Sequence, residues 1–280
     1  MNDVILSHFS LNRAPFTVDY DTENMFAFHS FEQGMRRLLH AAGTRGTALV
    51  VGEPGTGKTA LARSLVGRLA SSGYKVFEQL VPCAKAPARA VVEGLLTKLG
   101  EQIPFNNPPR AMRLLHQSLL AIADKNIIPV VILDDAHHFT RDCWLSLKAL
   151  MNHDLDSKQP LLLVFLGGPS CLRLLNLAAL TEVRDRMSFC YYLQGLTASE
   201  VRPYLEARLK WAGCDRALFP EDLVGELAQH SQGLPRRVNR LANACLLAAA
   251  TMDRKLIDRD CLRAALSELQ FQPPQREDRP

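Results

Sequence analysis

The chain has 280 residues, more than one ordinary hydrophobic core requires, so we expect one large and one smaller domain. A hydrophobic fraction of 47% and a charged fraction of 22% are typical of a soluble globular protein. The longest apolar stretches, at 127–133 and 161–166, are much shorter than the ~20 residues of a membrane helix. The N-terminus also lacks a signal-peptide pattern. We therefore predict a cytoplasmic protein with no membrane contact.

Residues 1–30 are a mixed segment with Pro15 and several aromatic residues, and a predicted helix follows at 31–42. Beyond the turn at 43–46, short apolar runs alternate with helical ones. Because parallel strands need helical crossovers, this alternation predicts an α/β fold with a five-stranded parallel sheet buried on both faces. The expected strands are 48–51, 75–80, 129–133, 161–166 and 188–193, and the expected helices between them are 58–70, 86–99, 110–124, 141–151 and 170–177.

The β pattern stops at Leu196, and the remaining chain has only helical periodicity, so we expect an all-α lid after the α/β domain. The polar tail from Gln270 has the composition of a disordered segment. The expected lid helices are 198–211, 220–231, 235–250 and 258–267. The predicted organisation is an N-terminal arm at 1–30, an α/β domain at 31–195, a helical lid at 196–269 and a disordered tail at 270–280.

A phosphate-binding motif lies between the first strand and the helix that follows it. Residues 52–59 read Gly-Glu-Pro-Gly-Thr-Gly-Lys-Thr, a complete G-x-x-x-x-G-K-[ST] loop. Glycines let such a loop wrap closely around an anion, on which the amide groups of a helix N-terminus converge. Lys58 supplies a charge for the β- and γ-phosphates, and the Thr59 hydroxyl is a ligand for Mg²⁺. The motif predicts a nucleoside triphosphate, against the alternative of a chance glycine-rich turn. The predicted binding residues are Gly52, Glu53, Pro54, Gly55, Thr56, Gly57, Lys58, Thr59 and Ala60.

An acid pair ends the third predicted strand, where Val130-Val-Ile-Leu133 is followed by Asp134 and Asp135. A strand buried on both faces carries no acid inside it, and α/β sheets bind ligands at the carboxyl ends of their strands. In a phosphate-loop protein Asp134 would hold Mg²⁺ through water, and Asp135 would orient or deprotonate the attacking water. The alternative is an acid pair that complements the dipole of the helix at 141–151.

Basic residues are concentrated after the phosphate loop. The net charge of the whole chain is only +4, yet residues 58–113 carry nine Lys or Arg against three Glu. This bias indicates either a solvated basic face or a surface that binds a polyanion.

The order of these motifs resembles that of AAA+ ATPases, which implies ATP and Mg²⁺ as ligands. Five further segments resemble signatures of the secretion-pathway assembly ATPases and of the related ATPases that assist transposition. The resemblance spans residues 9 to about 269, nearly the whole chain. The matching segments are 9–16 (F-S-L-N-R-A-P-F), 134–137 (D-D-A-H), 166–169 (L-G-G-P), 183–187 (V-R-D-R-M) and 233–239 (G-L-P-R-R-V-N).

The resemblance implies further site residues. AAA+ ATPases hydrolyse ATP at subunit interfaces, where a neighbour's arginine neutralises charge on the transferred phosphoryl group. Arg184 and Arg186 match the positions of this arginine finger, and Arg236 matches the lid arginine that senses the γ-phosphate. The alternatives are surface ion pairs of Arg184 and Arg186 with neighbouring acids, and a solvated helix start for Arg236. Phe16 would either pack near the adenine or serve as a hydrophobic anchor.

Two residues depart from the family pattern. The usual catalytic Glu is Asp135, which is one methylene shorter, and Gly168 stands where the family often places a polar sensor. Both changes predict slow ATP hydrolysis, typical of a switch more than of a motor. His137 and His138 follow the acids, but side chains of adjacent residues usually diverge, so we do not expect a metal site there.

We expect the protein to assemble with itself, as a ring or filament, when ATP binds. The first hypothesis is a regulator of transposition that binds duplex DNA without sequence preference and presents it to a transposase. Lys85 and Arg89 are the candidate DNA contacts, because loops after the second strand line the ring in DNA-threading relatives. One alternative is an ATPase of a secretion or envelope-assembly system, although such relatives continue into a membrane helix and a wall-binding module that this chain lacks. Another is a nucleotide-switch adaptor without hydrolysis.

Overall fold

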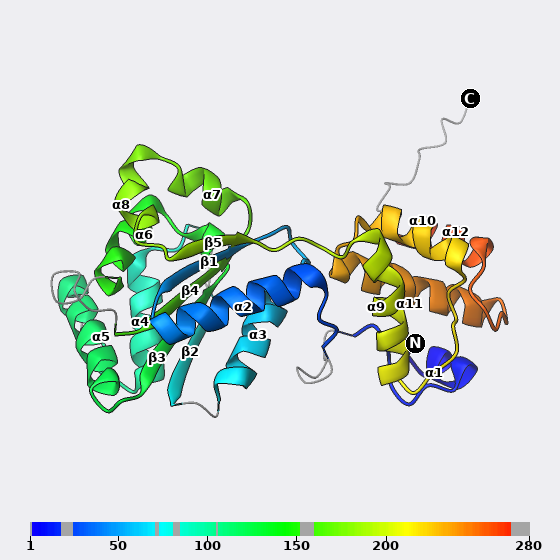
Figure 1. The fold of residues 1–280 in the computed structure, drawn as a ribbon, viewed down its shortest axis with the longest axis horizontal. Coiled ribbons are helices and arrows are strands. Elements are labelled where there is room, and N and C mark those ends of the chain that lie inside the picture. Colours follow the sequence, from blue (N-terminus) through cyan, green and yellow to red (C-terminus); the bar gives the residue numbers. More distant parts are fainter. Residues whose placement is uncertain are drawn as a thin grey trace. The chain divides into compact units, whose positions relative to one another are not determined.

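The computed structural model describes residues 2–17, 25–70, 73–80, 85–104, 106–151 and 160–269. The described residues form two compact units, one within 30–194 and the other within 1–29 and 195–280 (Figure 1). The tail at 270–280, which we expected to be disordered, lies outside the described residues. No helix in the described ranges is both long enough and apolar enough to cross a membrane.

The first unit is built on a sheet of five parallel strands in the order β2-β3-β4-β1-β5, which confirms the predicted α/β fold. Parallel pairing places all the carboxyl ends of the strands at one edge. The register aligns three of these ends, because Val51 pairs with both Gly167 and Tyr192. The strands are β1 Thr47–Val51, β2 Tyr74–Leu80, β3 Ile128–Asp134, β4 Leu162–Gly167 and β5 Phe189–Tyr192.

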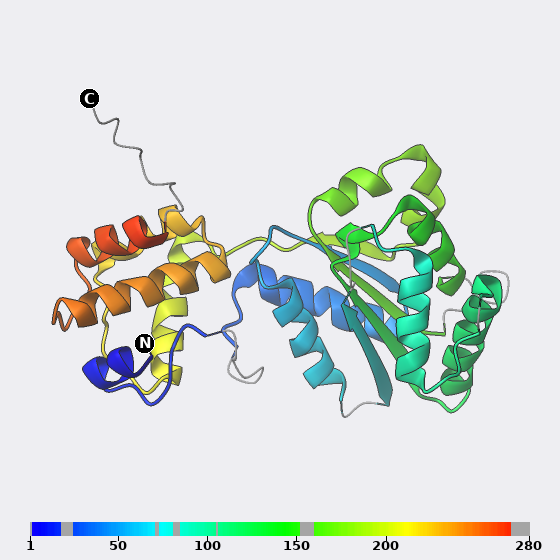
Figure 2. The same cartoon turned by 180° about the vertical axis from the view of Figure 1, so that it is seen from behind.

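Helices cover both faces of this sheet, with α2 and α3 on one face and α4 and α5 on the other (Figures 1 and 2). Alternate strand residues such as Leu49, Val131 and Phe165 are fully buried and join the core formed with α4 to α8. Phe165 also packs against Trp144, with ring centroids 4.6 Å apart and planes tilted by 48°. The helices are α2 His29–Thr44, α3 Lys58–Leu69, α4 Ala88–Leu99, α5 Pro108–Ala123, α6 Arg141–Leu147, α7 Ser170–Leu175 and α8 Thr181–Arg184.

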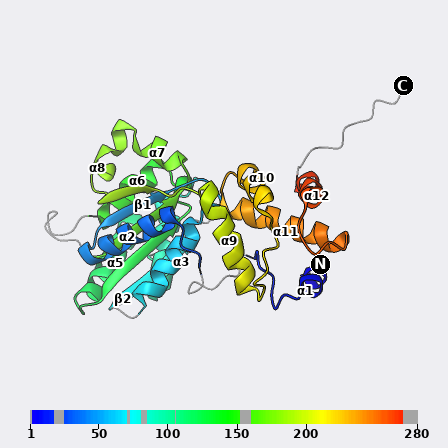
Figure 3. The same ribbon diagram turned by 45° about the vertical axis from the view of Figure 1, so that its right-hand side comes forward.

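The second unit consists of helices, four of which we predicted as the lid (Figure 3). A fifth helix, α1, was not predicted, and it packs against α11. We expected an N-terminal arm at 1–30, and described residues of this segment contact these helices. Phe9 is buried and its carbonyl accepts a hydrogen bond from Arg216 (2.9 Å), while the carbonyl of Thr17 accepts one from Arg208 (2.7 Å). The helices are α1 Asn2–Phe9, α9 Ala198–Trp211, α10 Glu221–Ser231, α11 Pro235–Thr251 and α12 Arg259–Leu269.

Phe16 belongs to this helical core. Its side chain is 8% exposed and packs edge-on against Phe219, with ring centroids 6.2 Å apart. Of the two interpretations offered for Phe16, these contacts support the hydrophobic anchor.

Hydrogen bonds of Glu200 connect the N-terminal segment to the start of α9. One carboxylate oxygen accepts a hydrogen bond from the His29 amide (2.7 Å), and the other accepts from the amide and hydroxyl of Thr197 (both 2.8 Å). Burial alone would raise the pKa of Glu200, but these hydrogen bonds hold it below its usual value. The associated stabilisation is therefore present above the unfolded-state pKa and is lost as the pH falls through the lowered pKa.

Replacing Glu200 by Ala should lower the free energy of unfolding by about 1–2 kcal/mol, because it removes a capping box and leaves the His29 amide without this acceptor. Urea unfolding of the full chain at pH 7 measures the change. Glu206→Ala on the same helix is the control, since its exposed ion pair with Arg202 contributes about 0.5 kcal/mol or less. Equal stability of the two variants would contradict the capping role.

Candidate nucleotide-binding site

The phosphate loop leaves the sheet at the aligned ends of β1, β4 and β5. The amide of Gly52 donates to the carbonyl of Gly167 at the end of β4 (3.2 Å). A side chain at position 52 would not fit, because an added Cβ would lie 2.6 Å from the carbonyl oxygen of Leu193. The sheet edge therefore fixes the point from which the loop starts.

Within the loop, two glycines have left-handed backbone conformations that other residues rarely adopt: Gly55 with φ 94° and Gly57 with φ 100°. The Thr56 side chain is buried, and its hydroxyl donates to the carbonyl of Glu53 (2.9 Å). Gly57 is the N-cap of α3, and no side chain of the described residues caps this helix. The amide groups in the first turn of α3, including Ala60, are thus oriented for an anion.

Lys58 lies over the loop. Its Nζ donates hydrogen bonds to the carbonyls of Gly52 (2.8 Å) and Glu53 (3.1 Å). Glu53 also accepts a hydrogen bond from the Tyr192 hydroxyl (3.3 Å), which joins the loop to the end of β5. Pro54 follows Glu53 in the loop. The ammonium group of Lys58 is therefore held against the backbone of the loop that is expected to bind the phosphates.

The loop and the acid pair meet through Thr59 and Asp134, which are 75 positions apart in the sequence. The Thr59 hydroxyl donates to Asp134 Oδ2 (2.7 Å), and Asp134 Oδ1 accepts from the Asp135 amide (2.8 Å). A hydroxyl beside a carboxylate is the set of hard oxygen donors that suits Mg²⁺ and that usually leaves several of its waters in place. These residues therefore fit the ion that the sequence implied.

Asp135 occupies a strained position next to Asp134. Its φ is 57°, and it is the N-cap of a short 3₁₀ helix, Ala136–His138. The helix α6 is capped instead by Thr140, whose side chain accepts a hydrogen bond from the Cys143 amide (3.1 Å). The N-cap of this helix is thus Thr140 and neither residue of the acid pair. That helix is also shorter than predicted, because it ends at Leu147 and continues as 3₁₀ turn Lys148–Leu150.

Sequence reasoning did not assign a role to His137, but its ring lies beside the acid pair. Its Nδ1 lies 3.8 Å from Asp135 Oδ1, and the ring packs against that of His138 with centroids 4.1 Å apart and planes tilted by 37°. Burial is the main cause that lowers the pKa of His137, and His138 and Lys58 lower it further, although Asp135 and Asp134 oppose them. A neutral ring offers one N–H donor and one acceptor.

Of the candidate arginines, Arg184 and Arg236 are exposed and Arg186 is half-buried. Arg184 ends α8, and its Nε lies 3.7 Å from Asp185, while Arg186 follows in the turn toward β5. Glu182, the other acid near them, is hydrogen-bonded to Lys148. Arg236 is exposed in the first turn of α11, in the helical unit.

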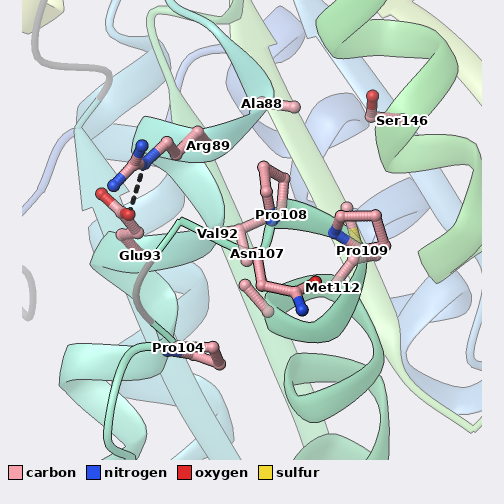
Figure 4. Close-up of a pocket in the computed structure, with 11 residues that line it drawn as sticks. Ala88, Arg89, Val92, Glu93, Pro104, Asn107, Pro108, Pro109, Met112 and Ser146 are labelled. Atoms are coloured by element: carbon pink, nitrogen blue, oxygen red, sulfur yellow. Dashed lines mark hydrogen bonds and ion pairs between the residues drawn. The ribbon is translucent and has the colours of Figure 1, made fainter.

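The candidate DNA contacts flank the start of α4. Lys85 is exposed with φ 58°, and Arg89 is held by Glu93 (Nε–Oε1 2.6 Å) and also donates to Asn106 (3.4 Å). A pocket of about 280 Å³ lies beside Arg89, between α4 and α5 (Figure 4). Ala86, which follows Lys85 in the sequence, donates its amide to the carbonyl of His138 (2.8 Å). This segment is therefore attached to the turn that follows the acid pair.

The central segment of the chain is similar to a known protein family. Residues 40–175, which include the phosphate loop and the acid pair, match the family described as "AAA domain". The match covers a little less than half of the chain. Of the residues discussed above as site residues, Arg184, Arg186 and Arg236 lie outside this AAA match.

Two solved structures share the AAA+ fold with nearly the whole chain. Cdc6p from Pyrobaculum aerophilum matches with a TM-score of 0.72 and 19% identity, covering 92% of this chain and 71% of that one. The ORC1 protein of Aeropyrum pernix, solved in complex with DNA, matches with a TM-score of 0.65 and 19% identity, covering 91% and 68%. At these identities the likeness shows the fold alone.

A relative in sequence is the general secretion pathway protein A of Aeromonas hydrophila. It is 26% identical over 263 residues, which cover 92% of this chain but 47% of the relative. The chain therefore spans less than half the length of this protein.

Proposed function

We propose that the chain binds Mg²⁺ and ATP at the loop 52–60 and hydrolyses ATP slowly. The observation that carries this proposal is the Thr59–Asp134 hydrogen bond, which brings the two expected magnesium ligands together beside Lys58. Mg²⁺ would neutralise the phosphate charge there. Asp135 would take a proton from the attacking water as the water oxygen bonds to the γ-phosphorus and the bond to ADP breaks.

We propose Arg184 or Arg186 as the finger that one subunit contributes to the next, and Arg236 as the sensor within its own subunit. Arg184 and Arg236 are exposed, as contact with a neighbouring subunit or a ligand requires.

Mixing variants separates the two roles. Adding inactive Lys58→Ala subunits should restore ATP turnover to a finger variant but not to Arg236→Ala. If the added subunits rescue neither Arg184→Ala nor Arg186→Ala, the finger role is ruled out for both residues.

The proposed biological role is a cytoplasmic regulator of transposition that assembles with itself on ATP, binds duplex DNA and contacts a transposase. The basic excess at 58–113 and the fold shared with a protein solved on DNA support the DNA component. The backbone link between Ala86 and His138 supports coupling of a bound polyanion to the acid pair. Arg89 is partly neutralised by Glu93, so DNA would compete with this ion pair.

The second candidate is an ATPase of a secretion or envelope-assembly system, and the relative in the general secretion pathway favours it. The two candidates differ in their polyanion. ATP-dependent binding to duplex DNA at low salt would favour the first, and its absence would favour the second.

The proposed hydrolysis predicts the behaviour of Asp135→Asn. An amide cannot accept the proton of the attacking water, so phosphate release should fall about 100-fold or more while a fluorescent ATP analogue still binds. Wild-type turnover should not exceed ~1 s⁻¹, the low end of ordinary enzyme rates. Asp124→Asn, at an exposed position after α5, is the control and should be neutral. Equal, near-zero rates for wild type and Asp135→Asn would instead indicate a nucleotide-switch adaptor.

DNA binding predicts a change in salt dependence. With a non-hydrolysable ATP analogue, the double variant Lys85→Ala/Arg89→Ala should bind random duplex DNA more weakly. The plot of log K against log salt concentration should become less steep by about 2, since each phosphate contact contributes ~0.9 to the magnitude of its slope. Lys98→Ala/Lys125→Ala removes the same charge from two other exposed positions and is the control. An equal slope for both double variants would show that Lys85 and Arg89 do not contact DNA.

A further inference from the structure

Gly168 directly follows β4, which pairs with the strand that ends at the acid pair. Gly168 does not have a left-handed backbone, so its conformation does not require glycine. The imidazole of His137 lies next to Gly168. A Cβ added to Gly168 would lie 3.7 Å from Cγ of this ring and 3.9 Å from Cδ2. An alanine would fit there in ordinary contact, but a longer side chain directed at the ring would displace it.

Neighbouring groups fix the position of His137. A Cβ added to Gly167 would lie 3.2 Å from the backbone nitrogen of His137, so the main chain passes closely over the end of β4. The imidazole packs against the ring of His138, and the 3₁₀ turn that carries both residues accepts a hydrogen bond from the Ala86 amide at the carbonyl of His138. The ring is therefore held between the strand end and the acid pair.

The Nδ1 atom of His137 is buried and has no hydrogen-bond partner within the described part of the chain. A buried polar atom without a partner is costly, by about 1–3 kcal/mol in typical proteins. Its nearest charged neighbour is Asp135 Oδ1, at 3.8 Å, a distance beyond hydrogen-bond range that a small rotation of the carboxylate would close. Catalytic hydrogen bonds are often longer without substrate and tighten when it binds.

We propose that His137 is a positioning residue for Asp135: its Nδ1 donates to the carboxylate and holds the free oxygen toward the attacking water. It thereby replaces the polar side chain that position 168 lacks. This role rests on the proposed ATP hydrolysis, in which Asp135 accepts the proton of that water. It also gives a physical reason for Gly168, since the imidazole requires the space that a sensor side chain would occupy.

The test compares single-turnover ATP hydrolysis and the Kd of a fluorescent ATP analogue in full-length variants, each checked for folding by thermal unfolding. His137→Ala should lower the hydrolysis rate about 10- to 100-fold, the range observed when a group that orients a ligand is lost, with the Kd unchanged within about twofold. His137→Asn, whose amide can still donate to Asp135, should recover part of the rate. His40→Ala, an exposed position on α2, is the control for removal of a histidine.

The double variant His137→Ala/Gly168→Asn gives the sharper result. With the ring removed, Asn at position 168 has room to reach the acid pair, so the double variant should be faster than His137→Ala. In the presence of His137, the Asn should slow hydrolysis. A merely structural role for His137 would change the melting temperature or the Kd and would give no such rescue.

The outcomes separate the two proposals. If wild type hydrolyses ATP and His137→Ala is equally fast, only the role of His137 is wrong. The same holds if His137→Ala loses nucleotide binding and hydrolysis together. If wild type binds the nucleotide but gives no hydrolysis, the proposed activity and the role of His137 are both overturned.

Discussion

The hydrogen bond between Thr59 and Asp134 is the contact on which the site depends, because it joins two segments that are 75 residues apart. The parallel register makes this contact possible: β1 and β3 both end at the same edge of the sheet, with β4 between them. The phosphate loop follows β1 at this edge, and the acid pair lies at the end of β3. The positions of Lys58 and Asp135 follow from these two strand ends.

The same edge explains why small residues are needed around the site. Gly52 lies too close to Leu193 for a side chain, and Gly168 lies under the imidazole of His137. Gly57 provides a left-handed turn from which α3 starts without a side-chain cap. These three glycines contribute no side-chain functional group. They leave room for neighbouring groups and allow the backbone conformation that starts α3.

Much of this arrangement could be predicted from the sequence. All five strands lie within one residue of their predicted bounds. Short runs rich in β-branched and aromatic residues, separated by helical segments, are typical of parallel strands. The capping role of Thr140 and the pairing of Arg89 with Glu93 were missed, although the rules for N-caps and for i, i+4 pairs indicate both. Contacts between distant segments could not be read from local patterns. The packing of Phe9 and Phe16 with the C-terminal helices depends on tertiary structure, and the position of His137 over Gly168 depends on the turn that Asp135 starts.

The most direct test of the account is the affinity of the full chain for a fluorescent ATP analogue with Mg²⁺, before and after Lys58→Ala. Loss of a charged hydrogen-bond donor of this kind costs about 1.5–3 kcal/mol, so we predict binding about 10- to 100-fold weaker for the variant while its melting temperature stays close to that of wild type. If the folded variant binds the nucleotide as tightly as wild type, the loop at 52–60 is not the triphosphate site and the account is contradicted.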